Sequence, residues 1–491
     1  MLLLIFSKTL ALGGGRYNVI DMFFNLVMNL KKRLRTRWQH PQGYALVLRV
    51  SLPLIVGMAS STIMMVTDRI FLANYSLEAV AAAMPAGILA FVPTSFFMGV
   101  CTYANVFIAH YYGARAKHRI GPALWQGIYF ALLSGLLMIA ISFSADFLFA
   151  LGGHPPEVQK MEKIYFTVLT LGGGFNVIMA VLGCFYSGQG ITRPIMVINI
   201  IGMLLNVPLN YLMINGLGPF PEMGIFGAAL ATVISWIVEC LLFAFIIFSR
   251  ANLDQFNLRP SWPERDLLKR LWRFGLPSGL QFVADVATFT LFVFLVGRMG
   301  LQALAANNIV FSLNQIAFVP VLGLNVGIST LVGQSLGARN TQAAQEVTAS
   351  AMHLAFLYML GVALWFVLAP LPLLELFRPR EMAGPEFTAI SRLGVELLRL
   401  VAIYCIFDSF TIIYSGALRG AGDTRFVMLA MLITSLTIMI APTILAVYMD
   451  WGIKFTWYCM TVYISVLGII YYKRFKSGVW KSIQVVETTR V

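Results

Sequence analysis

The stretch SLPLIVGMASSTIMMVTDRIFLANY, residues 51–75, is a long apolar run that holds an aspartate, Asp68, in its second half. A run of about 20 apolar residues is long enough to cross a bilayer as a helix. An ionised carboxylate at bilayer depth costs roughly 2.5–3.5 kcal/mol even on lenient insertion scales, so it is rarely kept for packing alone. It usually faces a cavity, pairs with a polar neighbour, or binds a cation or proton. The stretch therefore predicts a membrane helix that carries a functional group.

Comparable apolar runs recur along nearly the whole chain. Of its 491 residues, 59% are hydrophobic and 11% are charged, and the mean hydropathy is +0.80. A soluble protein would carry about a quarter charged residues. We therefore predict an all-α, polytopic membrane protein with about twelve transmembrane helices. The spans are expected at roughly 47–74, 80–111, 121–150, 163–187, 194–215, 224–249, 268–298, 303–335, 346–376, 390–418, 424–448 and 452–472.

The basic residues cluster in alternate loops. In a soluble domain, the net charge of +14 and the pI near 9.6 would suggest a nucleic-acid partner. In a membrane protein the positive-inside rule explains such clusters instead, so we expect no nucleic-acid partner. Because an even number of spans returns the chain to its starting side, both termini should be cytoplasmic. The clusters lie at 31–37, 115–119, 250–273 and 473–481.

Landmarks in the first half of the chain recur in the same order in the second half. Gly113-Ala114-Arg115 recurs as Gly337-Ala338-Arg339, an offset of 337 − 113 = 224. A chance tripeptide match is common, but several ordered matches at nearly one offset indicate an internal repeat. The other matches are Pro53 with Pro277 and Gly99 with Gly323 at 224, Tyr186-Ser187-Gly188 with Tyr414-Ser415-Gly416 at 228, and Thr192-Arg193 with Thr424-Arg425 at 232.

Each repeat holds six predicted spans, so the two halves have the same orientation. This predicts two six-helix lobes related by a pseudo-two-fold axis along the membrane normal, with the substrate cavity between them. The expected domains are an N-terminal extension with a basic cytoplasmic segment (1–46), an N-lobe with spans 1–6 (47–249), a cytoplasmic linker (250–267), a C-lobe with spans 7–12 (268–475) and a cytoplasmic tail (476–491).

Four polar residues of the N-lobe are expected at a similar depth. Asp68 lies roughly 9 Å from the outer end of span 1, and Thr232 lies roughly 12 Å from the outer end of span 6. Asn206 and Asn210 are four residues apart, hence on one face of span 5. One carboxylate, two amides and a hydroxyl suit a cation site. The alternative is that the amides and the hydroxyl only bond neighbouring helices, which is worth about 0.6 kcal/mol each.

Two further aspartates, Asp285 in span 7 and Asp408 in span 10, are expected near the midplane, roughly 17 Å from the cytoplasmic end. Tyr404 lies one turn from Asp408, and Gln281 lies one turn from Asp285. Two carboxylates that share a pocket cannot both ionise cheaply unless a cation sits between them. The pair therefore predicts a place where a proton or Na⁺ is exchanged for a cationic substrate.

Other intramembrane charges have simpler interpretations. Glu239 in span 6 and Glu396 in span 10 are also candidates, but Glu396 is expected to form a structural ion pair with Arg392 or Arg399. Arg69 points about 100° away from Asp68 around the helix, so it need not pair with it and is expected to reach the outer interface.

Several chemistries lack a sequence signal. The five cysteines fall in predicted spans without metal-ligand spacing, and we expect no disulfide. No phosphate-binding loop is found. We therefore expect no cofactor and no catalytic residues, and transport energy must come from an ion gradient, with Na⁺ or H⁺ bound at either the N-lobe or the C-lobe set.

An ordered set of short motifs resembles the multidrug and toxic compound extrusion (MATE) transporters, most closely their NorM-like branch. The resemblance covers about residues 47–475. The segments that carry it are Met65-Val66-Thr67-Asp68, Gly113-Ala114-Arg115, Gln189-Gly190-Ile191-Thr192-Arg193-Pro194, Leu205-Asn206-Val207-Pro208-Leu209-Asn210, Gly227-Ala228-Ala229-Leu230-Ala231-Thr232, Gly275-Leu276-Pro277, Gly333-Gln334-Ser335-Leu336-Gly337-Ala338 and Gly416-Ala417-Leu418-Arg419-Gly420-Ala421-Gly422-Asp423-Thr424.

The resemblance implies a two-lobed antiporter that expels organic cations in exchange for Na⁺ or H⁺. Some members have an acidic residue where this chain has Asn210, and the NorM-like branch often has glutamate where it has Asp285. By resemblance, the cation-coupling residues of the N-lobe are Asp68, Asn206, Asn210 and Thr232, and the cation-coupling or substrate residues of the C-lobe are Asp285, Tyr404 and Asp408.

We therefore expect a monomeric multidrug exporter of small organic cations in a bacterial plasma (inner) membrane, working by rocker-type alternating access among membrane lipids. One alternative is a lipid-linked oligosaccharide flippase of a related superfamily, which would need a cavity rich in Arg and Lys. Another is an intramembrane enzyme, for which no catalytic cluster is found. The third is a passive channel, against which the two-lobe repeat argues without deciding.

Overall fold

The structure is a computed structural model that describes residues 35–150, 152–378 and 384–487. Most of the expected N-terminal extension, residues 1–34, and the end of the expected tail, residues 488–491, lie outside these ranges. No strand occurs in the described residues, as predicted for an all-α protein.

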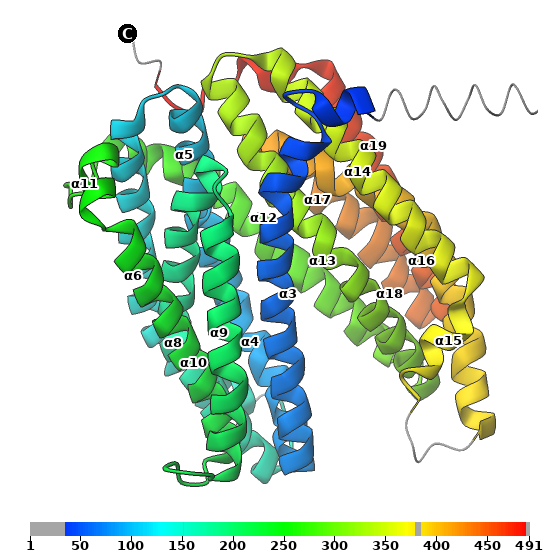
Figure 1. Ribbon diagram of the computed structural model, residues 1–491. Helices are drawn as coiled ribbons and strands as arrows, with labels where there is room; N and C mark the ends of the chain where they lie inside the picture. Colours follow the sequence, from blue (N-terminus) through cyan, green and yellow to red (C-terminus); the bar gives the residue numbers. More distant parts are fainter. Residues whose placement is uncertain (1–34, 151, 379–383, 488–491) are drawn as a thin grey trace, which may run out of the picture.

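Twelve helices of the described chain are long and apolar enough to cross a membrane, which confirms the predicted number. Figure 1 shows them side by side in two bundles. In the first half the spans are α3 (Tyr44–Tyr75), α4 (Leu77–Cys101) with α5 (Ala104–Gly113), α6 (Ile120–Ser142), α8 (Pro156–Gln189), α9 (Arg193–Asn215) and α10 (Gly224–Ile247). In the second half they are α12 (Arg265–Gly297), α13 (Leu301–Gly337), α14 (Thr341–Leu368), α16 (Gly384–Gly420), α17 (Thr424–Thr434) with α18 (Ala441–Tyr448), and α19 (Gly452–Ser477).

The third and ninth spans are shorter than predicted, because each ends before a separate short helix. The third span, α6, ends at Ser142, whose hydroxyl donates a 2.7 Å hydrogen bond to the Ile139 carbonyl. The short helix α7 (Ala145–Ala150) follows it. The second break falls after Leu368, because Pro370 lacks the N–H that would continue the helix. The short helix α15 (Pro370–Glu375) follows it. The remaining short helices are η1 (Lys117–Arg119), α11 (Arg250–Phe256) and η3 (Val479–Ser482), and a π-helical turn (Ser435–Ile440) joins α17 to α18.

Two helices, α3 and α12, lie at the junction of the bundles. The first span, α3, packs on α9 of its own lobe and on α13 of the other. The seventh span, α12, packs on α17 of its own lobe and on α4 of the other. These contacts are equivalent under the repeat, since the first span corresponds to the seventh, the second to the eighth and the fifth to the eleventh.

Repeat-related glycines permit both crossings between the lobes. A Cβ atom on Gly99 of α4 would lie 2.7 Å from the Cα atom of Gly279 in α12. A Cβ atom on Gly323 of α13 would lie 2.9 Å from the backbone nitrogen of Ile55 in α3. At the repeat offset of 224, Gly99 corresponds to Gly323 and Ile55 corresponds to Gly279. The two crossings are therefore equivalent positions of the repeat. Gly99 and Gly323, which mark the repeat in the sequence, are therefore points where the backbones of the two lobes approach closely.

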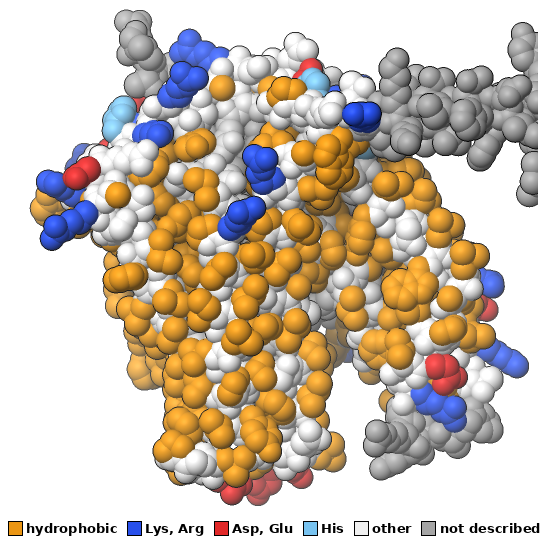
Figure 2. Space-filling model, in the orientation of Figure 1, with side chains coloured by type: hydrophobic (Ala, Val, Ile, Leu, Met, Phe, Trp, Pro, Cys, Tyr) orange, Lys and Arg blue, Asp and Glu red, His pale blue; other side chains and the backbone are white. Residues whose placement is uncertain are grey.

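The lobes are pressed together at one end, which we call the closed end, where α3 begins and α19 ends (Figure 1). Here a Cβ atom on Gly113 would lie 2.0 Å from the carbonyl oxygen of Gln334, and one on Gly337 would lie 2.0 Å from that of His110. The His110 Nε2 atom is 2.9 Å from the Gly420 carbonyl oxygen across the interface. At the opposite, open end the space-filling view shows the two lobes parted by a hollow (Figure 2).

Candidate functional site

The carboxylate of Asp68 is held inside the N-lobe by two neutral donors. The Asn210 Nδ2 group, from α9, donates a 2.8 Å hydrogen bond to Oδ1. The Tyr165 hydroxyl, from α8, donates a 2.8 Å hydrogen bond to Oδ2. Asp68 is only 7% exposed, so it lies within the bundle and does not face lipid. Its predicted orientation toward polar partners is therefore what the structure shows.

The other two predicted N-lobe residues, Asn206 and Thr232, lie between α9 and α10. Asn206 donates through Nδ2 to the Thr232 hydroxyl at 3.4 Å. The amide oxygens of Asn206 and Asn210 are buried and have no hydrogen-bond partner among the described residues. A carboxylate, two unpaired amide oxygens and a hydroxyl are the kinds of oxygen ligand that bind Na⁺. The carboxylate alone could bind a proton.

Tyr165 is a member of this cluster that the sequence analysis missed. A tyrosine in an apolar span is common, and its position relative to Asp68 depends on how α8 is rotated in the bundle. Arg69, by contrast, is exposed and forms no close ion pair in the described part of the chain, although its charge acts on Asp68. The expectation was that it need not pair with Asp68.

The C-lobe brings its two predicted aspartates toward one tyrosine. Tyr463, from α19, interacts electrostatically with both Asp285 of α12 and Asp408 of α16. Asp408 is 6% exposed and has no hydrogen-bond partner within the described ranges, and Tyr404 is buried one turn before it. Gln281, one turn before Asp285 on α12, acts on its carboxylate. The two aspartates do not act on each other electrostatically, so a pocket shared by both stays a prediction.

A cation on the same lobe acts on one of the two aspartates. The Arg419 guanidinium interacts electrostatically with Asp285, without a close ion pair, and donates a 2.8 Å hydrogen bond to Asn325 Oδ1. In the sequence, Arg419 stands out only as part of a motif. Because Arg419 offsets the charge of Asp285, Asp408 is the less compensated carboxylate of the two.

Glu396 forms an ion pair, but the predicted partners are wrong. Its carboxylate pairs with Lys454 at the start of α19, and not with Arg392 or Arg399 on its own helix. Both members of the pair are largely exposed. The neighbouring helix supplies the closer cation, and sequence spacing along one helix cannot reveal such a neighbour.

Aromatic rings bridge the lobes on the open side of the Gly99–Gly279 crossing. The rings of Phe91 from α4 and Phe282 from α12 meet edge to face, with centroids 6.0 Å apart. Asp285 follows Phe282 by one turn on α12. Aromatic faces beside a carboxylate attract organic cations through cation–π and charge interactions.

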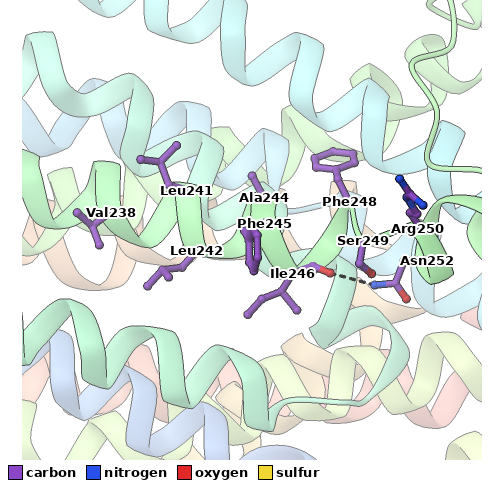
Figure 3. Close-up of a pocket in the computed structure, with 10 residues that line it drawn as sticks. All are labelled: Val238, Leu241, Leu242, Ala244, Phe245, Ile246, Phe248, Ser249, Arg250 and Asn252. Carbon is purple, nitrogen blue, oxygen red and sulfur yellow. Dashed lines mark hydrogen bonds between the residues drawn. The ribbon is translucent and has the colours of Figure 1, made fainter.

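A surface groove elsewhere on the N-lobe is a poorer candidate. It runs along the end of α10, where Val238 and Phe245 give it an apolar lining, and it ends at Arg250 (Figure 3). Asn252 donates a 3.1 Å hydrogen bond to the Ile246 carbonyl at this end. The groove lies on the flank of the bundle and no acidic side chain lines it, so it offers nothing to hold a cation.

Twelve membrane-crossing helices in two repeated bundles, each with buried carboxylates, define a polytopic membrane transport protein. Comparison with known proteins agrees with this class. The MatE family model matches residues 53–212 and 277–444, one block in each half. The chain belongs to the MatE family, whose members are transport proteins and not enzymes.

Curated relatives confirm the resemblance to the NorM-like branch. The "Probable multidrug resistance protein NorM" of Thermotoga maritima is 27% identical over 91% of this chain and 95% of its own length. The "Multidrug resistance protein NorM" of Burkholderia vietnamiensis is 28% identical over 78% of this chain and 82% of its own length.

Solved structures share the fold. A multidrug resistance MATE family transporter of the MOP superfamily, in an outward-facing conformation, has a TM-score of 0.80 at 22% identity, covering 90% of this chain and 97% of its own. A MOP superfamily transporter from Pyrococcus furiosus has a TM-score of 0.79 at 23% identity, covering 90% of this chain and 97% of its own.

Proposed function

We propose that this protein is a secondary active multidrug exporter that expels small organic cations in exchange for Na⁺ or H⁺. The observation that carries the proposal is the environment of Asp68, which is buried and bonded only to the neutral donors Asn210 and Tyr165. Arg69 acts on Asp68 without forming a close ion pair, so the carboxylate is free to bind and release a cation. The names of the relatives as multidrug resistance proteins support the same cargo class.

The orientation follows from the distribution of charge. Lys and Arg side chains gather around the closed end and α11 (Figure 2). Under the positive-inside rule that end is cytoplasmic, so the first and last spans have their chain ends in the cytoplasm and the hollow opens outward. We place the protein, as a monomer among lipids, in a bacterial inner membrane.

The proposed cycle couples the two lobes through competition. In the outward-open state the ion binds at Asp68 and its neighbours or at Asp408, and the organic cation leaves. Rocking of the lobes about the crossings at Gly99 and Gly323 then exposes the carboxylates inward, where the ion leaves and the next organic cation binds. Coupling requires that ion and substrate bind the two states with different affinity or compete for one site.

A lipid-linked oligosaccharide flippase has less support. Its pyrophosphate cargo would require several cations facing the hollow. Asp285 and Asp408 outnumber Arg419 in the C-lobe group, and Asp68 has no basic hydrogen-bond partner. The balance of charge favours cationic cargo.

Everted membrane vesicles provide the test. We expect ethidium to accumulate when either an imposed Na⁺ gradient or an imposed pH gradient is present, and the accumulation to collapse when that gradient is removed. Ethidium accumulation that is the same with and without each gradient would refute the proposal.

A further inference from the structure

Glu239 is a buried carboxylate that the cycle above does not use. It lies in the second half of α10 and is 4% exposed. It forms no hydrogen bond and no ion pair with any residue that the structure describes. No titratable group of the same lobe acts on it electrostatically, including its neighbour Cys240, Cys184 on α8, and Asp68 and Tyr165 further toward the open end.

A glycine on the facing helix makes room for this carboxyl group. A Cβ atom on Gly202 of α9 would lie 1.5 Å from Glu239 Oε1 and 2.4 Å from its carboxyl carbon. No other side chain could be placed at 202 without displacing the carboxyl group. The Glu239 carboxyl group is therefore enclosed between α9 and α10, inside the lobe, and does not reach into lipid. We call this position against Gly202 the seat of Glu239.

The Glu239 carboxyl group lies between the same two helices as the Asn206–Thr232 pair. On α9, Gly202, Asn206 and Asn210 follow one another at intervals of one turn, on one face. On α10, Thr232 and Glu239 are seven residues apart and share the facing side, and Asn206 bonds Thr232. Glu239 therefore lies about 10 Å from Thr232 along the helix, toward the closed end.

The chemistry of the seat selects a proton as its ligand. A bound Na⁺ needs several oxygen ligands, whereas Gly202 offers no side chain and no other polar side chain of the described chain bonds Glu239. A single carboxyl group can hold a proton unaided, and the neutral form suits an unpaired, buried position.

We propose that Glu239 is a second, inner proton site of the N-lobe, on the path between the Asp68 cluster and the cytoplasm. This inference rests on the proposed exchange function and names H⁺ as an ion that the lobe carries. In the conformation described here an O–H bond on the Glu239 carboxyl group holds the proton. When the lobes rock inward, that bond breaks, the proton passes to cytoplasmic water, and the carboxylate remains to be protonated in the next cycle.

Proton release by the purified protein tests the proposal without transport. Tetraphenylphosphonium is added to wild type in weakly buffered detergent, and a pH-sensitive dye records the protons released. We expect Glu239→Gln to release fewer protons than wild type, by about one per bound cation. Glu396→Gln is the matched control, because its glutamate is exposed and paired with Lys454. Equal release by Glu239→Gln and wild type would overturn the proposal.

A second variant separates this role from a folding defect. Gly202→Ala should displace the carboxyl group and reduce proton release, and Gly202→Ala with Glu239→Ala should restore thermal stability without restoring release. Full release by the folded Gly202→Ala protein would contradict the proposed seat. Gradient-driven ethidium accumulation by wild type is measured in parallel: if it is present while Glu239→Gln releases protons normally, only the role of Glu239 fails.

Discussion

Asn210 donates a 2.8 Å hydrogen bond from its side-chain amide to the carboxylate of Asp68, although 142 residues separate them in the chain. The bond joins α9 to α3 in the interior of the N-lobe. It uses the amide nitrogen and leaves the Asn210 amide oxygen without a partner among the described residues. The pair therefore holds an anionic oxygen and an unpaired neutral oxygen inside one lobe.

Replacing Asp68 by asparagine should abolish efflux, because the variant keeps the size of the side chain but loses the charge that binds the ion. Ethidium efflux from cells, with the amount of protein in the membrane measured alongside, checks this. Asp146→Asn is the control, since Asp146 is largely exposed and pairs with Lys163 at the surface. Normal efflux by Asp68→Asn would remove Asp68 from the mechanism.

Asp408→Asn should also abolish efflux while leaving the protein folded. The Asp408 side chain has no hydrogen-bond partner in the described chain to lose, so the change should have little effect on thermal stability. A matched control is Asp254→Asn, which removes an exposed surface ion pair with Arg259 worth about 0–1 kcal/mol. Efflux at the wild-type rate with Asp408→Asn would assign coupling to the N-lobe alone.

The crossing between Gly99 and Gly279 should not tolerate a side chain. Gly99→Val would force its Cβ atom to within 2.7 Å of the Gly279 Cα atom, so α4 and α12 must separate. We expect a loss of about 1–3 kcal/mol, seen as a lower melting temperature in detergent. Gly361→Val serves as the reference, because a Cβ atom there meets nothing within 4 Å. Equal melting temperatures for the two variants would contradict the close approach.

The segment after α19 ties the lobes together at the closed end. Val485 is 1% exposed within the apolar core of the N-lobe, and Glu487 lies 3.8 Å from Arg119 and 3.4 Å from Arg270. Ending the chain after Ser482 removes this buried valine, a contribution of about 1.5–3 kcal/mol. We expect the shortened protein to open more often toward the cytoplasm.

Cysteine labelling can measure that opening. A Gln334→Cys variant reports on the closed end, because Gln334 lies against Gly113 of the other lobe. Its reaction with a membrane-impermeant maleimide, applied from the cytoplasmic side, should be faster in the shortened chain. The same rate in both chains would show that the segment does not hold the lobes.

The number of spans and the repeat could be predicted because they depend on local composition and on the spacing of residues along the chain. The Asn206 and Asn210 pair could be predicted to share a face for the same reason. Tyr165, Arg419 and the Lys454 partner of Glu396 could not, because each depends on how a separate helix is rotated and how deep it lies. These are properties of packing that a single sequence does not express.

The offset of the repeat is not constant where α8 and α16 pack on their neighbours. Gly188 lies against the carbonyl of Asn105 and the side chain of Ile108, and Gly416 lies in the same way against Asn325 and Ile328. The match of Gly188 with Gly416 has an offset of 416 − 188 = 228. Gly190 and Gly422, which both have a positive φ, are 422 − 190 = 232 apart.

The most direct test of antiport uses proteoliposomes that contain the purified protein and no other. An imposed gradient of tetraphenylphosphonium should drive Na⁺ or H⁺ in the opposite direction, against that ion's own gradient, and Asp68→Asn should stop the ion movement. Passage of the organic cation without any opposing ion flux would contradict the exchange mechanism.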